Sequence, residues 1–173
     1  MSAIVPEDGL SLQHEHFMID ANLRMPLNEE SKYSETMSLV ADLLIALGMS
    51  ELGKLELYSA TDLRAPGWSF IQPITTSHIS AHYFEKPGLK PHIHMDIYSC
   101  MGFDWRKAIE ILERHCKIDD WYANFFHRDM ELRKRTVWMM AGIGNDVQEV
   151  NVLSPTKIKL PVVRKQVKVP VHS

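Results

Sequence analysis

The residues best suited to chemistry lie in the middle of the chain, in the stretch Pro73-Ile-Thr-Thr-Ser-His-Ile-Ser-Ala-His82. A serine that attacks the backbone carbonyl before it needs a strained peptide bond, a group that handles its proton and donors that hold the oxyanion. Ser77 follows Thr76, and we expect Ser69 and His82 on adjacent strands to supply a second hydroxyl and an imidazole. The residue types alone leave the alternative that Ser77 is an ordinary hydroxyl at a strand end.

Histidines and carboxylates offer a second kind of chemistry. His14 and His16 form one His-x-His pair, and His92 and His94 form another. Alternate residues of a strand point to the same face, so each pair could share a metal ion. His92, His94 and Asp96 are therefore a rival metal site, with solvated strand histidines as the alternative.

The two cysteines, Cys100 and Cys116, do not make a disulfide framework. We expect Cys116 to lie in the core on a helix, whereas Cys100 ends a strand on its polar side. Its residue type leaves open whether Cys100 is a reactive thiol or a small buried hydrophobe. With no export signal in the sequence, we expect a reduced, cytoplasmic setting.

Composition narrows the class of protein. Hydrophobic residues make up 45% of the 173 residues, which is enough for the core of one domain. The 19 basic residues are balanced by 22 acidic ones, so charge gives no footprint for nucleic acid. The most apolar segment, 39–49, is about half the length of a membrane span and contains Asp42. We therefore expect neither a nucleic-acid partner nor a membrane partner.

Hydrophobic periodicity predicts an α+β fold. Alternating apolar and polar residues predict strands at 14–23, 54–60, 68–75, 77–84, 92–100, 121–127 and 148–153. Apolar stripes at helical spacing predict one helix that Ser34 or Thr36 caps and that ends near Gly48. They predict a second helix that Asp104 caps and that runs through Cys116. The expected architecture is a two-layer sandwich, with a mostly antiparallel sheet and helices on one face.

The chain is expected to have three parts. Residues 1–13 are a leader, 14–128 are the α+β domain and 129–173 are a C-terminal extension of unknown role. In the extension, 130–140 is predicted as a short helix or an extended segment. The basic, proline-broken stretch 157–171 is predicted as a tail that lies on the body or on a partner.

The strand predicted at 92–100 indicates what the uncovered face of the sheet carries. Ile93, Met95 and Ile97 point to one face, and the more polar residues between them point to the other. We therefore expect the polar face to be the floor of a site.

Two motifs together resemble the prokaryotic S-adenosylmethionine decarboxylases. Thr-Ser-His-Ile-Ser-Ala-His (76–82) is similar to the family's Glu-Ser-His-aliphatic-x-aliphatic-His segment. Met-Asp-Ile-Tyr-Ser-Cys (95–100) is similar to its Asp-(Val/Ile)-(Phe/Tyr)-(Thr/Ser)-Cys-Gly segment. His-Phe-Met-Ile-Asp (16–20) looks like the family's first strand, and Asp-Trp-Arg-Lys-Ala (104–108) like its second helix. The resemblance covers about residues 14–128.

The resemblance implies a cofactor made from the chain itself. Ser77 Oγ would attack the Thr76 carbonyl, and elimination and hydrolysis would leave a pyruvoyl group at position 77. The chain would be cut into residues 1–76 and 77–173. The pyruvoyl group would form a Schiff base with the amine of a small amino-acid substrate and act as an electron sink for decarboxylation.

The resemblance also implies roles for other residues. By position, His82 and Ser69 match the family's processing histidine and serine, and Cys100 matches the acid that protonates the product. Family members pair as dimers with shared active sites, so a homodimer is expected. The implied substrate is S-adenosylmethionine, and the implied pathway is the synthesis of the polyamine spermidine.

Two departures from the family pattern keep other functions open. Thr76 stands where the family has glutamate, and Leu63 lies near the position of an aromatic residue that helps to hold adenine. One alternative is the same chemistry on another amino acid, such as arginine or ornithine. Another is an unprocessed relative without catalytic activity.

Overall fold

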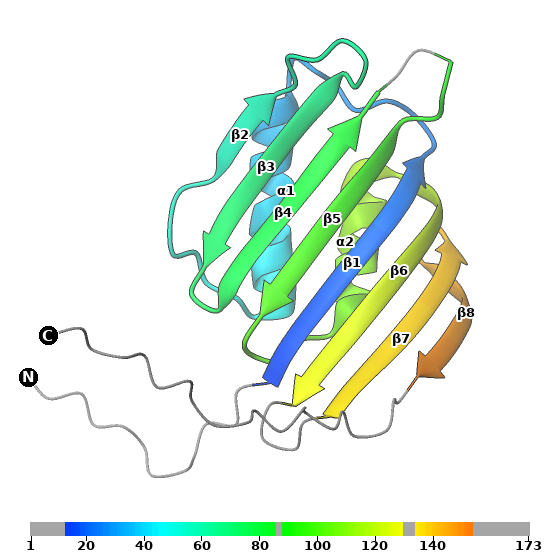
Figure 1. Ribbon diagram of the computed structural model, residues 1–173. Coiled ribbons are helices and arrows are strands. Elements are labelled where there is room, and N and C mark those ends of the chain that lie inside the picture. Colours follow the sequence, from blue (N-terminus) through cyan, green and yellow to red (C-terminus); the bar gives the residue numbers. More distant parts are fainter. Residues whose placement is uncertain (1–12, 86–87, 130–133, 154–173) are drawn as a thin grey trace, which may run out of the picture.

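The computed structural model describes residues 13–85, 88–129 and 134–153, which form an α+β two-layer sandwich (Figure 1). Its strands are β1 Gln13–Leu23, β2 Glu56–Ser59, β3 Gly67–Ile74, β4 Ser77–Phe84, β5 His92–Ser99, β6 Ile118–Asp129, β7 Lys134–Ile143 and β8 Asp146–Leu153. They form one antiparallel sheet in the order β2-β3-β4-β5-β1-β6-β7-β8. Helices α1, Lys32–Leu47, and α2, Trp105–Cys116, cover one face of this sheet (Figure 1). The predicted fold class is confirmed.

Burial alternates along the central strands, as a period of two requires. In β5, Ile93, Met95 and Ile97 are buried under the helices, and the residues between them face the open side. The same alternation runs through β1, β3 and β4. The open face of the sheet therefore carries the polar residues, as the sequence predicts.

The start of α1 differs from the prediction. The helix begins at Lys32 after Ser31, so Ser34 and Thr36 lie inside it instead of capping it. The hydroxyl of Ser34 donates to the backbone oxygen of Ser31 at 3.0 Å, which is a bond within the first turn and not a cap. The other predicted ends hold, because Gly48 has a left-handed φ of 65° and Asp104 accepts a hydrogen bond from the backbone of Arg106.

The sheet continues beyond residue 128. The segment predicted as a short helix or an extension is strand β7 over its described part, so the helical alternative is wrong there. β7 pairs with β6, and β8 pairs with β7 over residues that include the strand predicted at 148–153. The tail predicted at 157–171 lies outside the described residues.

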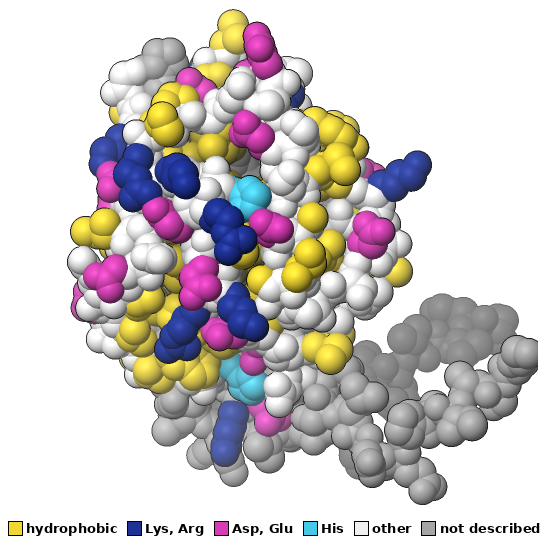
Figure 2. All heavy atoms as spheres, turned by 180° about the vertical axis from the view of Figure 1, so that it is seen from behind, with side chains coloured by type: hydrophobic (Ala, Val, Ile, Leu, Met, Phe, Trp, Pro, Cys, Tyr) yellow, Lys and Arg dark blue, Asp and Glu magenta, His cyan; other side chains and the backbone are white. Residues whose placement is uncertain are grey.

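The helix side of the molecule has a mixed surface. In Figure 2, basic and acidic side chains alternate over the helices, with hydrophobic patches between them. Such an interspersed pattern is typical of a solvated surface. In the described part of the chain, neither helix is long and apolar enough to cross a membrane.

Candidate active site

A strained backbone marks the start of β4. Thr75 and Thr76 form the two-residue turn between β3 and β4, and Ile74 pairs with Ser77 across it. Ser77 has a φ of 151°, which side chains of L-residues rarely adopt. Such conformations cost about 1–3 kcal/mol and cluster at functional sites. The strain lies directly beside the Thr76–Ser77 peptide bond.

The carbonyl of Thr76 has a well-placed donor. The backbone N–H of Cys100 donates to the Thr76 carbonyl oxygen at 3.0 Å. A donor in this place would stabilise negative charge on that oxygen during attack on the carbonyl carbon. The hydroxyl oxygen of Thr76 is buried and has no hydrogen-bond partner among the described residues. Cys100 thus contacts the predicted cleavage site through its backbone, a role that its residue type did not suggest.

The hydroxyl of Ser77 contacts the next residue. Ser77 Oγ lies 3.1 Å from Nδ1 of His78, within reach for exchange of a proton. The sequence assigned no role to His78, because neighbouring residues of a regular strand point to opposite faces. The unusual φ of Ser77 departs from that geometry. A histidine directly after the serine was the available signal.

Ser69 and His82 lie together, as predicted. They are partners across β3 and β4, and Ser69 Oγ is 2.7 Å from Nδ1 of His82. The pair lies on the open face. However, His82 is five residues along β4 from Ser77, which is about 16 Å in a strand. Within one chain, the structure therefore brings this pair together at a distance from Ser77.

The loop after β5 is held by a buried carboxylate. Glu15 in β1 is only 7% exposed, and it accepts a hydrogen bond from the backbone N–H of Phe103 at 2.8 Å. Its other oxygen lies 3.1 Å from Nδ1 of His127 in β6. These contacts fix the loop that follows Cys100. Neither Glu15 nor His127 was predicted as a site residue, because their proximity depends on the pairing of β1 with β6.

The rival metal site is not assembled. Nδ1 of His92 lies 3.2 Å from the backbone oxygen of Lys90, His94 contacts Asp20, and Asp96 contacts His16 at 3.1 Å. The three predicted ligands thus have separate partners. Within the described ranges, no group of three or more histidine, cysteine or carboxylate side chains could hold a metal ion.

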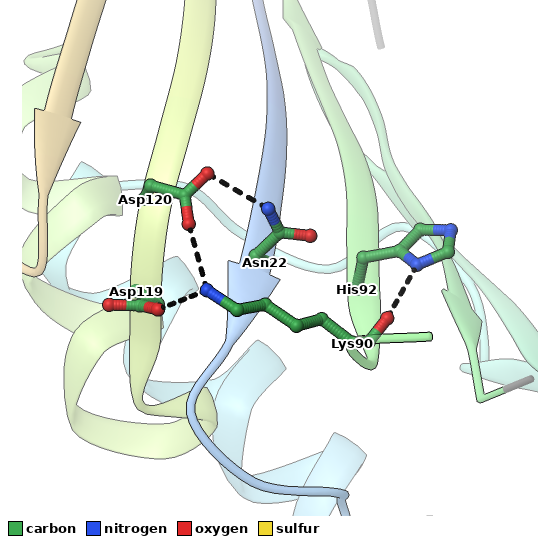
Figure 3. Close-up of polar contacts among 5 residues, drawn as sticks. All are labelled: Asn22, Lys90, His92, Asp119 and Asp120. Atoms are coloured by element: carbon green, nitrogen blue, oxygen red, sulfur yellow. Dashed lines mark hydrogen bonds and ion pairs between the residues drawn. The ribbon is translucent and has the colours of Figure 1, made fainter. Parts of the chain in front are cut away.

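A polar network occupies the other end of the open face (Figure 3). Asn22 donates to Asp120 at 2.8 Å, and Lys90 contacts both Asp119 and Asp120. The hydrogen bond from Asn22, assisted by Lys90, holds the pKa of Asp120 below its usual value. Asp120 and His92 line a shallow hollow of about 260 Å³. This hollow lies several residues along the strands from Ser77.

Comparison with known protein families matches the S-adenosylmethionine decarboxylase model over residues 19–129. This match spans more than half of the chain and includes both motifs. The chain belongs to the S-adenosylmethionine decarboxylase family. The match agrees closely with the extent of the predicted resemblance, 14–128. A comparison with curated proteins found no match.

Proposed function

We propose that the chain is a pyruvoyl-dependent S-adenosylmethionine decarboxylase that cuts itself between Thr76 and Ser77. The observation that carries this proposal is the strained φ of Ser77, combined with the donor from Cys100 on the Thr76 carbonyl. Family membership supports decarboxylation as the reaction class.

Self-cleavage uses groups that are already in contact. Ser77 Oγ attacks the Thr76 carbonyl carbon, and His78 accepts the hydroxyl proton across 3.1 Å. The Cys100 N–H holds the oxygen as it gains charge, and the amide becomes an ester. Loss of the α-proton of residue 77 breaks the ester and releases the Thr76 carboxylate. Water then hydrolyses the dehydrated residue 77, which loses its nitrogen as ammonia. The products are chain 1–76 and chain 77–173, which begins with a pyruvoyl group.

The residues around position 77 fit such a group. When bound to the substrate, a pyruvoyl group withdraws the electrons left by the departing carboxylate. Cys100 contributes its thiol as the acid that returns a proton to the substrate carbon. The same residue therefore acts through its backbone in cleavage and through its side chain in decarboxylation.

Ser69 and His82 act on a second copy of the chain. They are about 16 Å from Ser77 of their own chain, and they lie on a sheet face that no described element covers. A homodimer with its open faces together would bring this pair to the partner's site, where His82 removes the α-proton. This arrangement matches the shared active sites that the family resemblance implies.

The proposed substrate is S-adenosylmethionine, and the proposed role is polyamine synthesis in the cytoplasm. One observation favours a second candidate. Leu63, near the position of the family's adenine-stacking aromatic residue, is 91% exposed in the loop before β3. An aliphatic residue there gives no ring for stacking, so arginine or ornithine is the alternative substrate.

Release of carbon dioxide from labelled substrates tests the proposal. The wild-type chain should decarboxylate S-adenosylmethionine, and the Ser77→Ala chain should release nothing above background. Carbon dioxide release from arginine or ornithine alone would change the proposed substrate but leave the proposed reaction unchanged. Wild-type protein that decarboxylates none of the three would contradict the proposed function.

A further inference from the structure

Four side chains surround the ring of Tyr98 on the open face beside the proposed cleavage site. The hydroxyl of Tyr98 is 2.7 Å from Nδ1 of His14, and the ring of His16 lies edge-on at 5.6 Å. The guanidinium of Arg128 lies over the Tyr98 ring at 5.0 Å from its centre. The ring of His78 is 5.9 Å from the same centre. Tyr98 is thus the floor of a cluster of nitrogen-bearing side chains.

Arg128 differs from most arginines in the described part of the chain. Arg24, Arg64, Arg106 and Arg114 each pair with a carboxylate. Arg128 pairs with none of the described carboxylates, and its buried Nε has no hydrogen-bond partner among the described residues. A buried guanidinium N–H without a hydrogen bond is destabilising, because nothing compensates for its lost hydration. A ligand that supplies an acceptor would provide the missing hydrogen bond.

The position of Arg128 connects it to the reacting residue. Its guanidinium reaches from β6, across β1, to the ring of Tyr98 in β5. His78 borders the same ring, and its Nδ1 is 3.1 Å from Ser77 Oγ. The nearby carboxylate of Asp96 contacts His16. Arg128 and His78 therefore border the same place on the Tyr98 ring, close to Ser77. Neither side chain pairs with a described carboxylate.

We propose that Arg128, together with His78, binds the carboxylate of the amino-acid substrate above the ring of Tyr98. The planar fork of a guanidinium matches a carboxylate with two parallel hydrogen bonds, and the flat ring below it keeps that fork in place. The proposal rests on the proposed function for the identity of the ligand as an amino acid. It adds a specificity residue, because an amine without a carboxylate gains nothing from Arg128.

Binding to a chain that cannot react tests this site directly. In the Ser77→Ala chain, titration calorimetry would compare S-adenosylmethionine with its decarboxylated form. Adding Arg128→Met should weaken binding of S-adenosylmethionine by about 10- to 100-fold, the loss expected for one charge-assisted pair. Binding of the decarboxylated form should change by less than about twofold. Arg128→Lys should recover part of the loss.

Arg135→Met is the matched control. Arg135 is the exposed partner of Arg128 on β7, on the same face but one strand farther from Tyr98. Both ligands should bind this control as they bind the Ser77→Ala chain. If carbon dioxide release identifies arginine as the substrate, the two ligands compared are arginine and agmatine. If it identifies ornithine, they are ornithine and putrescine.

Three results would overturn the carboxylate site. They are an equal weakening of the binding of both ligands by Arg128→Met, no effect of Arg128→Met on binding, and binding that does not depend on the ligand's carboxylate. A second readout is intact mass, because Arg128→Met with Ser77 present should still cut at position 77 while its KM rises. A wild-type chain that never cuts would contradict the proposed function, whereas carboxylate binding that depends on Arg128 would still support this site.

Discussion

At position 77, backbone and side chain contribute separately to the proposed cleavage site. The φ of 151° strains the chain beside the peptide bond, and the hydroxyl rests 3.1 Å from the imidazole of His78. The donor for the Thr76 oxygen comes from Cys100, which directly follows strand β5, the partner of β4. Thr76 itself contributes a carbonyl to these contacts, and its side chain makes none among the described residues. Threonine in place of the glutamate that the resemblance implies therefore leaves the hydrogen bond to the Thr76 carbonyl in place.

The two roles proposed for Cys100 can be separated by one variant. Cys100→Ala keeps the backbone N–H and should cut between residues 76 and 77 at the wild-type rate. It loses the thiol, so decarboxylation should fall by about 100-fold or more. Intact mass and carbon dioxide release measure the two steps. Unchanged turnover would place the proton donor elsewhere.

Cys116 provides the control for Cys100. It is buried in α2, and burial raises the pKa of its thiol to about 12, so it stays protonated at neutral pH. Cys116→Ala should lower thermal stability but leave the turnover of the folded enzyme unchanged. Loss of turnover in this variant would mean that the effect of Cys100→Ala is not specific to its thiol.

Elements were more predictable than contacts. The order of elements from β1 to β6 follows from the periodicity of the sequence, because buried positions alternate in strands such as β5 and recur in stripes on helices. The contact of Ser77 with His78 did not follow, because it depends on an unusual φ. The contact between Glu15 and His127 did not follow either, because periodicity does not predict that β1 pairs with both β5 and β6.

The β7–β8 hairpin depends on a glycine. Gly142 lies at the irregularity in the pairing of β7 with β8, and a Cβ there would overlap the backbone oxygen of Asp146 and the ring of Trp121. Gly142→Ala should lower the free energy of unfolding by about 1–3 kcal/mol, measured by denaturant titration. The neighbouring Ile143, which is 49% exposed, gives a control. Ile143→Ala should change the free energy of unfolding by less than about 0.5 kcal/mol. Equal stability of Gly142→Ala and wild type would refute this packing.

At the scale of the whole molecule, the polar network of Figure 3 links β1, β6 and the loop before β5. The pKa of Asp120 is lowered in the folded protein, so its charged form is the one that the fold stabilises. The contribution is present above the unfolded pKa of aspartate and disappears as the pH falls through the lowered folded value.

Asp120→Ala should therefore destabilise the protein at pH 7, by about 1 kcal/mol or less because its carboxylate is half-exposed and solvent screens it. The difference in Tm from wild type should shrink as the pH is lowered toward 3. Thermal unfolding at a series of pH values measures it. A difference that grows toward acid pH would contradict a stabilising charge on Asp120.

The proposed action across a homodimer also concerns the whole molecule. His82→Ala alone should slow self-cleavage by about 100-fold or more. When His82→Ala and Ser77→Ala chains are expressed together, the intact Ser77 of the first meets the intact His82 of the second. Only the His82→Ala chain should then be cut, and mass spectrometry distinguishes the two chains. No rescue in mixed dimers would mean that His82 acts within its own chain or not at all.

Self-cleavage is the central claim, and the intact mass of freshly purified wild-type protein under denaturing conditions tests it most directly. Self-cleavage predicts two chains in place of one of 19.9 kDa, one ending at Thr76 and one beginning with a pyruvoyl group at position 77. A single uncut chain of 173 residues, in protein that releases carbon dioxide from substrate or in protein that does not, would contradict it.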